Sequence, residues 1–347
     1  MVSSPVVDSG HAGPFVSVPQ DIDPSRWRSD LLTGFSCTDL PLTPHVPIVG
    51  EPDIPVGGVL IRRDRDRPSD PSVRRPAVLY IHGWNDYFFQ THLADFWVGL
   101  GYDFYAVDLR RYGRALRPGQ LFGYITDLDE YAAEIDAAVT VIRADGHDTL
   151  VLMGHSTGGL TAALYADTHP GVFTAVVLNS PWLELSGNLL LRQVVSRLVS
   201  GVARMAPTSI LPIVDQGFYR RTILAAEAGE WDFDTEWKRL NAPIRLGWGR
   251  AIIRAHERVA AGLHIDVPVL VLCSARSVQG RTWSEEMAQA DTVLDADGVA
   301  HRAPDLGRHV TVVRISGGLH DLVLSAPPVR AEFFRTVETW VAAYCEL

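Results

Sequence analysis

A serine flanked by glycines stands in the sequence Gly154-His155-Ser156-Thr157-Gly158, which has the form Gly-x-Ser-x-Gly. The apolar run Leu150 to Met153 precedes it, and a run of helix-forming residues follows it. A serine on a sharp strand-to-helix turn needs glycine on both sides, because a side chain at either position would collide with its neighbours. The pattern and its surroundings predict that Ser156 is a nucleophile.

A serine hydroxyl is a weak nucleophile at neutral pH, so a base must accept its proton and a third group must orient that base. Among the twelve histidines we choose His320, which follows Gly317-Gly318-Leu319 directly after the last apolar run. A loop at that place lies at the carboxyl end of a sheet, where ligands bind in open α/β folds. The neighbouring Asp321 is expected to orient this loop.

The group that orients the base is a carboxylate, and the chain order serine, acid, histidine places it before His320. Directly after the apolar run Val269 to Cys273 the chain offers no carboxylate. A segment that looks inserted follows, and acids appear beyond it. We favour Asp291. Asp295 and Asp297 remain alternatives, and either of them would also suit the cap of a following helix.

An acyl-transfer transition state develops negative charge on the carbonyl oxygen, which backbone N–H groups stabilise directly. One donor is the N–H of Thr157, the residue after the nucleophile. We assign the second donor to Trp84, in the loop that follows the apolar run Ala77 to Ile81. Trp84 is also expected to form a wall of the acyl pocket. Further substrate-binding candidates are Trp182, Phe218 and Trp248, although aromatic residues in a helical cap more often serve its own packing.

Short apolar runs alternate with helical patterns over most of the chain. The runs are continuous and rich in branched residues, as in strands that are buried on both faces. Between them, residues 131–142 repeat apolar side chains at intervals of three and four, and the last helix has the same stripe. This alternation predicts an α/β fold with a mainly parallel, doubly wound sheet. The predicted strands are Gly58 to Arg62, Ala77 to Ile81, Phe104 to Val107, Leu150 to Met153, Ala175 to Leu178, Val269 to Cys273 and Val310 to Ile315.

One interval interrupts the alternation, because residues 182–265 read as mostly helical and contain no convincing strand. We interpret it as an inserted helical cap. The core is then divided into a first part, residues 55–181, and a second part, residues 266–347. Residues 1–54 form an N-terminal arm and the region of the first strand, and either the arm or the cap would be the contact surface of a homo-oligomer.

Composition narrows the classes of function. The net charge is −10 and no basic cluster is present, which argues against a nucleic-acid partner. Three scattered cysteines predict neither a disulfide framework nor a metal site, and they favour a cytoplasmic location. No leader pattern or 18-residue apolar run indicates export or a membrane span. Lys238 is the single lysine among 31 basic residues, which we interpret as a compositional bias without a function.

Together these motifs resemble the α/β-hydrolase superfamily and, within it, the monoacylglycerol lipase and serine aminopeptidase group. The resemblance covers most of residues 55–345. It implies an eight-stranded sheet with a helical cap after the sixth strand, the triad Ser156, Asp291 and His320, and the oxyanion donors Trp84 and Thr157. The segments that carry it are 82–83, 108–114, 154–159, 290–295 and 318–321.

We therefore expect a cofactor-independent serine hydrolase, an esterase, lipase or lactonase of the EC 3.1.1 type. Its small-molecule substrate would be a carboxylic ester or lactone with a sizeable apolar portion. The nearest alternative is an amidase or aminopeptidase, which needs an anchor for an amine. A third hypothesis is a ligand-binding protein of this fold without catalysis. Acids of the cap that could anchor an amine are Glu184, Glu227, Glu230 and Asp232.

Overall fold

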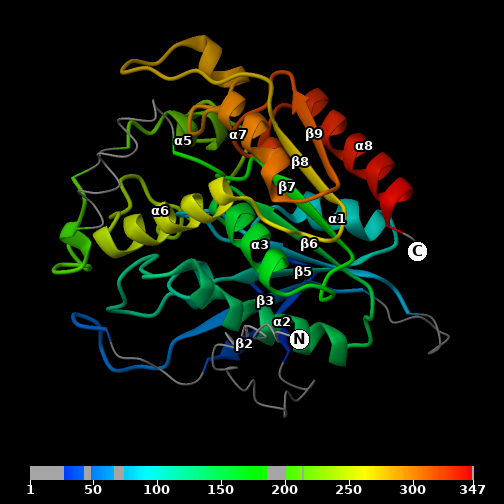
Figure 1. Cartoon of the computed structure of the whole chain (residues 1–347), viewed down its shortest axis with the longest axis horizontal. Helices are drawn as coiled ribbons and strands as arrows, with labels where there is room; N and C mark the ends of the chain where they lie inside the picture. Colours follow the sequence, from blue (N-terminus) through cyan, green and yellow to red (C-terminus); the bar gives the residue numbers. More distant parts are fainter. Residues whose placement is uncertain (1–26, 43–47, 66–73, 186–200, 213–214, 346–347) are drawn as a thin grey trace, which may run out of the picture.

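Nine strands form one sheet that runs through the molecule, in the order β1-β2-β3-β5-β4-β6-β7-β8-β9 (Figure 1). The computed structural model describes residues 27–42, 48–65, 74–185, 201–212 and 215–345. Residues 1–26 of the predicted arm and residues 186–200 of the predicted cap lie outside these described residues. The oligomer surface predicted there is therefore not addressed by the fold.

The chain enters the sheet through an antiparallel edge. The strands β1 (Arg28–Ser29), β2 (Phe35–Pro41) and β3 (Gly57–Arg63) pair antiparallel, and β3 also pairs antiparallel with β5. About eight strands were predicted, and the sheet has nine, of which β1 is a two-residue strand at the edge. For the same reason the inserted segment follows β7, the seventh strand, where the resemblance implied the sixth.

The remaining six strands are parallel and confirm the doubly wound sheet. They are β4 (Ala77–Ile81), β5 (Asp103–Asp108), β6 (Leu150–His155), β7 (Ala175–Asn179), β8 (Val269–Ser274) and β9 (Val310–Ile315). β4 to β8 are buried almost throughout, as their apolar sequences predict. β9 was predicted to be buried on both faces, but it is only partly buried because it is the edge strand.

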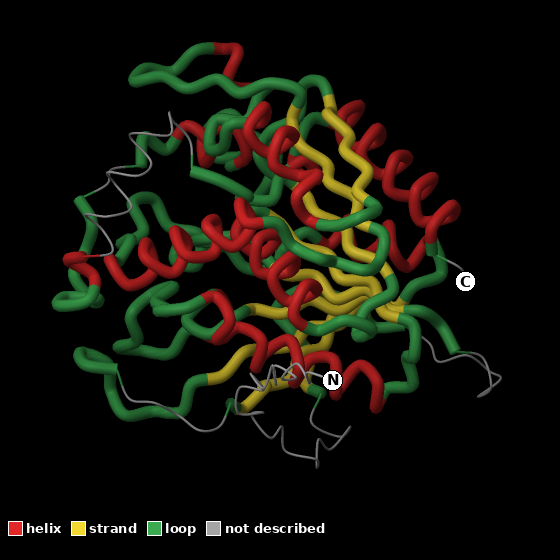
Figure 2. Tube along the Cα trace, viewed as in Figure 1, coloured by secondary structure: helices red, strands yellow, loops and turns green. Residues whose placement is uncertain are grey.

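Helices cover both faces of this sheet (Figure 2). On one face, α1 (Thr91–Gly99) and α8 (Pro327–Tyr344) pack against the strands. The other face is covered by α2 (Ala132–Ala144), α3 (Thr157–Thr168), α6 (Leu246–Ala261) and α7 (Ala296–Arg302). The short helix α5 (Phe218–Ile223) belongs to the segment between β7 and β8. None of the described helices is both long enough and apolar enough to cross a membrane.

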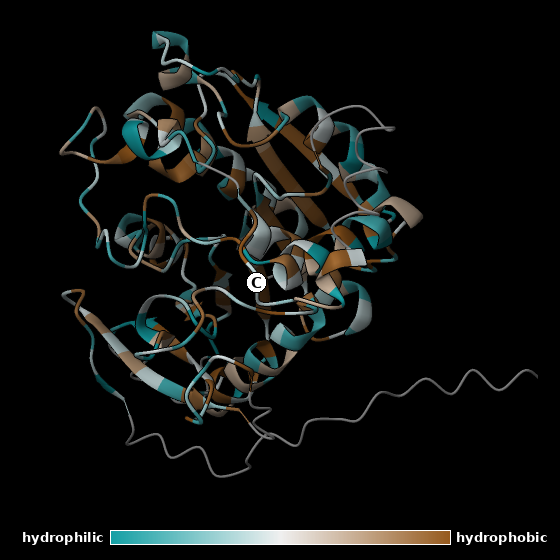
Figure 3. Ribbon diagram, turned by 90° about the vertical axis from the view of Figure 1, so that its left-hand side faces the viewer, coloured by the Kyte–Doolittle hydropathy of each residue, from teal (hydrophilic) through white to brown (hydrophobic). Residues whose placement is uncertain are grey.

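Hydrophobic residues concentrate in the strands, and hydrophilic ones lie mainly on loops and outer helix faces (Figure 3). Each face of the sheet has its own hydrophobic core cluster. These cores hold the strands rigidly, so the loops at the carboxyl ends of β4, β6, β8 and β9 start from fixed positions.

The turn between β6 and α3 carries Ser156 in a strained conformation, with φ 54° and ψ −118°. A Cβ atom on Gly154 would lie 2.5 Å from the carbonyl oxygen of Gly158. A Cβ atom on Gly158 would overlap the carbonyl oxygens of Ile81 and His82. The requirement for glycine on both sides of the serine is thus confirmed.

We expect Gly158→Ala to destabilise the fold by about 3 kcal/mol or more, because the new methyl group meets backbone atoms that cannot rotate away. Gly99→Ala in α1 is the matched control, since it is also a helical glycine and no atom lies within 4 Å of its added Cβ. There alanine should be neutral or stabilising by up to about 1 kcal/mol. Urea denaturation of both variants measures the difference, and equal effects would contradict the prediction.

Candidate active site

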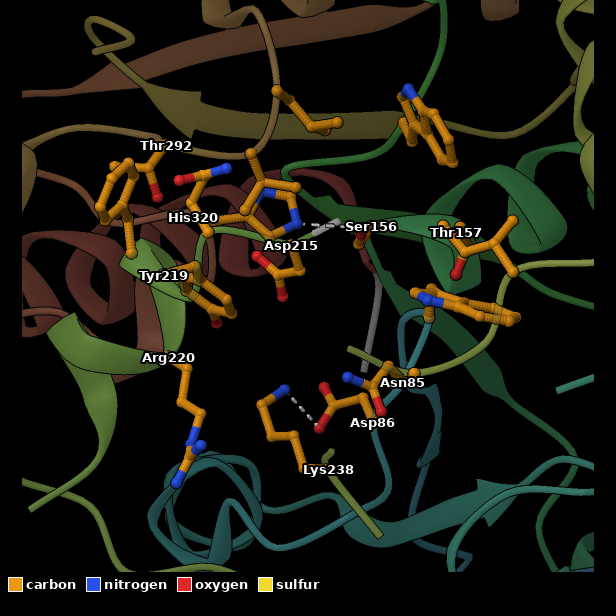
Figure 4. Close-up of a pocket in the computed structure, with 18 of the residues that line it drawn as sticks. Asn85, Asp86, Ser156, Thr157, Asp215, Tyr219, Arg220, Lys238, Thr292 and His320 are labelled. Atoms are coloured by element: carbon orange, nitrogen blue, oxygen red, sulfur yellow. Dashed lines mark hydrogen bonds and ion pairs between the residues drawn. The ribbon is translucent and has the colours of Figure 1, made fainter. Parts of the chain in front are cut away.

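Ser156, His320 and Asp291 come from loops at the ends of three different strands, and His320 lies within hydrogen-bond reach of the other two. Figure 4 shows the ring of His320 beside Ser156. Nε2 of His320 is 3.0 Å from Oγ of Ser156, and Nδ1 of His320 is 2.9 Å from Oδ2 of Asp291. All three residues are buried. With its proton on Nδ1, the ring donates to the carboxylate, and Nε2 can accept the serine proton.

Asp291 reaches this position because its segment leaves β8 and returns to it. Ser277 and Asp291 form a parallel bridge, in which the N–H of Val278 donates to the carbonyl oxygen of Asp291 at 2.9 Å. The intervening residues 278–290 project outward and contain the 3₁₀ turn Glu285–Gln289. Oδ1 of Asp291 accepts the N–H groups of Val293 and Leu294 at 2.7 and 2.8 Å, which fixes the carboxylate.

The two alternative acids lie elsewhere. Asp295 is the N-cap of α7 and accepts the N–H of Asp297 at 3.2 Å, the capping role considered for it. Asp297 is exposed and forms an ion pair with Arg314. Of the three candidates, Asp291 is the one whose carboxylate contacts His320.

The two N–H groups predicted as oxyanion donors belong to residues that line one cavity with Ser156. Thr157 is the first residue of α3, where backbone N–H groups lack an intrahelical acceptor and the helix dipole favours negative charge. The loop that carries Trp84 passes close to the nucleophile, since a Cβ atom on Gly83 would lie 3.0 Å from Cβ of Ser156. Their role as donors stays a prediction.

The cavity beside Ser156 and His320 has a volume of about 560 Å³, which is within the usual range for small-molecule sites. The predicted substrate-binding residues Trp84, Trp182, Phe218 and Trp248 all line it. Three of them pack together, with ring centroids of Trp84 and Trp248 4.1 Å apart and those of Trp182 and Trp248 5.9 Å apart. These rings therefore serve packing and also present an aromatic wall to the cavity. Contact with a substrate stays a prediction.

Another part of the cavity wall carries an ion pair that the sequence analysis missed. Nζ of Lys238 is 2.9 Å from Oδ1 of Asp86, and both side chains are nearly inaccessible, with 9% and 1% exposed. The interpretation of Lys238 as a mere compositional bias did not anticipate this position. A signal was available, because a chain that uses arginine at every other basic position retains one lysine, whose ammonium group is smaller than a guanidinium.

Two further buried polar residues, His155 and Asp321, lie close to His320. The ring of His155 is 4.9 Å from that of His320, and burial together with the neighbouring His320 holds the pKa of His155 well below its usual range. His155 is therefore neutral at pH 7. Burial raises the pKa of Asp321, whose carboxylate accepts hydrogen bonds from Asn179 at 2.6 Å and Gln90 at 3.2 Å. These bonds orient the loop after β9, as expected for Asp321.

Among the described residues, Asp86, His155 and Asp321 are the group whose side-chain ligand atoms come close enough to hold a metal ion, within 4.8 Å of one another. Two of the three are already engaged by protein groups. Asp86 pairs with Lys238, and Asp321 accepts from two side-chain amides. The ammonium group of Lys238 thus supplies a positive charge at this position.

The loop after β4 is also clasped by the segment between β7 and β8. Nδ2 of Asn85 donates to the carbonyl oxygen of Arg239 at 2.6 Å, and the N–H of Arg239 donates back to Oδ1 of Asn85 at 2.9 Å. The N–H of Asp234 donates to the hydroxyl of Tyr87 at 2.7 Å. These bonds stabilise Asn85 at its positive φ of 52°, directly beside Trp84.

Comparison with known proteins gives a family model described as serine aminopeptidase, S33, which matches residues 72–327. A monoacylglycerol lipase of Mycolicibacterium smegmatis is 34% identical over 130 residues, 36% of this chain and 44% of that protein. The chain thus spans less than half of that relative's length. Two crystal structures share the fold. One is a monoacylglycerol lipase of Paleococcus ferrophilus, with TM-score 0.57 and 20% identity over 78% of this chain and 96% of that one. The other is a soluble variant of the Saccharomyces cerevisiae monoglyceride lipase, with TM-score 0.60 and 16% identity over 88% and 97%.

Proposed function

The chain belongs to the serine aminopeptidase S33 family of the α/β-hydrolase superfamily, and from that premise we propose that it is a serine hydrolase of carboxylic esters or lactones with a sizeable apolar portion. The observation that carries the proposal is the series of contacts from Ser156 through His320 to Asp291. The aromatic wall of the adjoining cavity supports an apolar substrate portion.

In the proposed reaction, Oγ of Ser156 attacks the carbonyl carbon while Nε2 of His320 accepts the hydroxyl proton. Asp291 holds the ring in the required tautomer and stabilises its positive charge. The N–H groups of Trp84 and Thr157 bind the oxyanion. His320 then gives its proton to the leaving alcohol, and a water molecule that His320 deprotonates releases the acid from the acyl-enzyme.

We also propose that residues 182–265 act as a cap over this site. Phe218, Lys238 and Trp248 come from this segment and line the cavity together with Ser156. The cap would therefore determine much of the substrate preference, because it contributes side chains that the core does not supply.

Amide cleavage is the second candidate, because the matching family model is described as an aminopeptidase. Binding a substrate amine requires a carboxylate that is free to accept it. Among the described residues that line the cavity, the carboxylates are Asp86 and Asp215. Asp86 is paired with Lys238, and Oδ1 of Asp215 accepts the N–H of Gly217 at 2.8 Å, which leaves Asp215 as the candidate anchor for an amine. Three of the cap acids considered earlier are instead paired with arginines, Glu184 with Arg302, Glu227 with Arg220 and Glu230 with Arg330. These contacts favour esters over amides, and the intact contacts of Ser156 favour catalysis over binding alone.

The proposal is tested with p-nitrophenyl esters of graded chain length, amino-acid arylamides and a fluorophosphonate label, all on the wild-type protein. We expect the label on Ser156 and turnover of the esters. Turnover of arylamides without turnover of esters would establish the amidase instead. A protein that is neither labelled nor active on any of them would support the binding-protein hypothesis.

A further inference from the structure

The ammonium group of Lys238 lies in an enclosure that is suited to a cation. Besides the carboxylate of Asp86 at 2.9 Å, three aromatic rings surround Nζ. The ring centroids of Tyr219, Phe89 and Phe233 lie 5.5, 5.9 and 6.0 Å from it. We call the set Asp86, Phe89, Tyr219 and Phe233 the ammonium cage.

Aromatic faces combined with a carboxylate are the chemistry by which proteins bind alkylammonium ligands, because the rings present negative electrostatic potential and the anion neutralises the charge. The carboxylate of this cage can accept a further hydrogen bond, since Oδ2 of Asp86 is buried without a hydrogen-bond partner among the described residues. The cage is therefore a built cation site, and a side chain of the protein itself occupies it.

The cage opens to the cavity in which we propose that ester cleavage takes place. Tyr219, Asp86 and Lys238 all line that cavity with Ser156 and His320 (Figure 4). The ring of Tyr219 stands edge-on to that of His320, with centroids 5.4 Å apart. A substrate group that extends past His320 in this direction would meet the ammonium group of Lys238.

We propose that Lys238 selects the charge of the substrate: its ammonium group fills the cage, so the enzyme accepts neutral or anionic esters and rejects esters that carry an alkylammonium group. This inference rests on the proposed ester hydrolysis. The rejection has two physical causes. A second cation is repelled by Lys238, and the carboxylate and rings that would bind it are already occupied.

Two substrates of the same shape test the proposal, butyrylcholine and its uncharged isostere 3,3-dimethylbutyl butyrate. We expect the wild type to favour the neutral ester by roughly 100-fold or more in kcat/KM. Lys238→Ala empties the cage and should move this ratio at least about tenfold toward butyrylcholine. Lys238→Arg keeps the positive charge although its guanidinium is larger than the ammonium group, so it should still favour the neutral ester, with a lower kcat/KM for both substrates. Arg335→Ala on α8 removes a cation outside the cavity and controls for net charge.

Tetramethylammonium gives a binding test that does not depend on turnover of a cationic substrate. It should inhibit hydrolysis of the neutral ester by Lys238→Ala and leave the wild type unaffected. Adding Asp86→Asn to Lys238→Ala removes the anion of the cage and should abolish this inhibition.

Wild-type turnover of both esters at similar rates would overturn the proposal without any variant, so its test does not depend on whether Lys238→Ala folds. An unchanged preference in folded Lys238→Ala would also overturn it. Failure of the proposed function looks different, because then the wild type would cleave neither ester and Ser156 would not react with the fluorophosphonate.

Discussion

Ser156→Ala is expected to lower kcat/KM for p-nitrophenyl butyrate by about 10⁴- to 10⁶-fold. Oγ of Ser156, which lies 3.0 Å from Nε2 of His320, is the atom that would form the acyl-enzyme. The methyl group of alanine cannot act as a nucleophile in its place. The fold should be retained, because alanine fits the same turn with one atom fewer. Steady-state kinetics and fluorophosphonate labelling measure the two consequences together.

The matched control is Ser209→Ala, which removes an exposed serine hydroxyl from the segment between β7 and β8. It should retain the wild-type rate and the label. Loss of less than about tenfold in Ser156→Ala, with the label still incorporated, would show that another residue is the nucleophile.

Asp291→Asn should lower kcat for the same ester by about 10⁴-fold with little change in stability. Asparagine has nearly the same shape, but its amide cannot stabilise the positive charge that His320 acquires, and it favours the wrong tautomer of the ring. Oδ of asparagine can still accept from the N–H groups of Val293 and Leu294, so the turn is preserved. Circular dichroism and kinetics of the purified variant separate the two effects.

Asp295→Asn and Asp297→Asn are the controls for this prediction. Asp295 caps α7, and asparagine is an equally good cap. We therefore expect kcat to fall by no more than about threefold and the free energy of unfolding by no more than about 0.5 kcal/mol. A large loss of activity in Asp295→Asn with none in Asp291→Asn would move the acid of the triad and contradict the contact of Asp291 with His320.

Most of the sheet could be predicted because its central strands are short, continuous apolar runs, which are typical of strands buried on both faces. The strand β2, next to the edge, was less evident, since its exposed face carries residues such as Asp39 that a buried strand would lack. The turn of Ser156 could be predicted equally well, because close backbone contacts require the glycines around it. Features that depend on contacts between residues close in the chain can therefore be recognised in the sequence.

Asp86 and Lys238 could not be predicted in the same way, since they come from distant segments and meet only when the segment between β7 and β8 packs over the loop after β4. The residues next to each of them do not indicate burial, and the one signal for Lys238 is that it is the single lysine of the chain. Asp291, the proposed acid of the triad, is intermediate between these cases. Its motif could be recognised, but no carboxylate stands at the usual place directly after β8. The bridge between Ser277 and Asp291, which brings Asp291 close to the end of β8, cannot be read from the sequence.

The bridge between Ser277 and Asp291 divides the loop after β8 into a part that holds Asp291 and a part that lines the cavity. Its two paired residues hold Asp291 against the end of β8, whereas Val278, Gln279 and Gly280, on the outgoing side, face the cavity. We expect that the chain between them can change in length or sequence without moving Asp291, because the pairing at its two ends holds this residue in place. We therefore expect that the cavity lining contributed by this loop can be redesigned while the contact of Asp291 with His320 is kept.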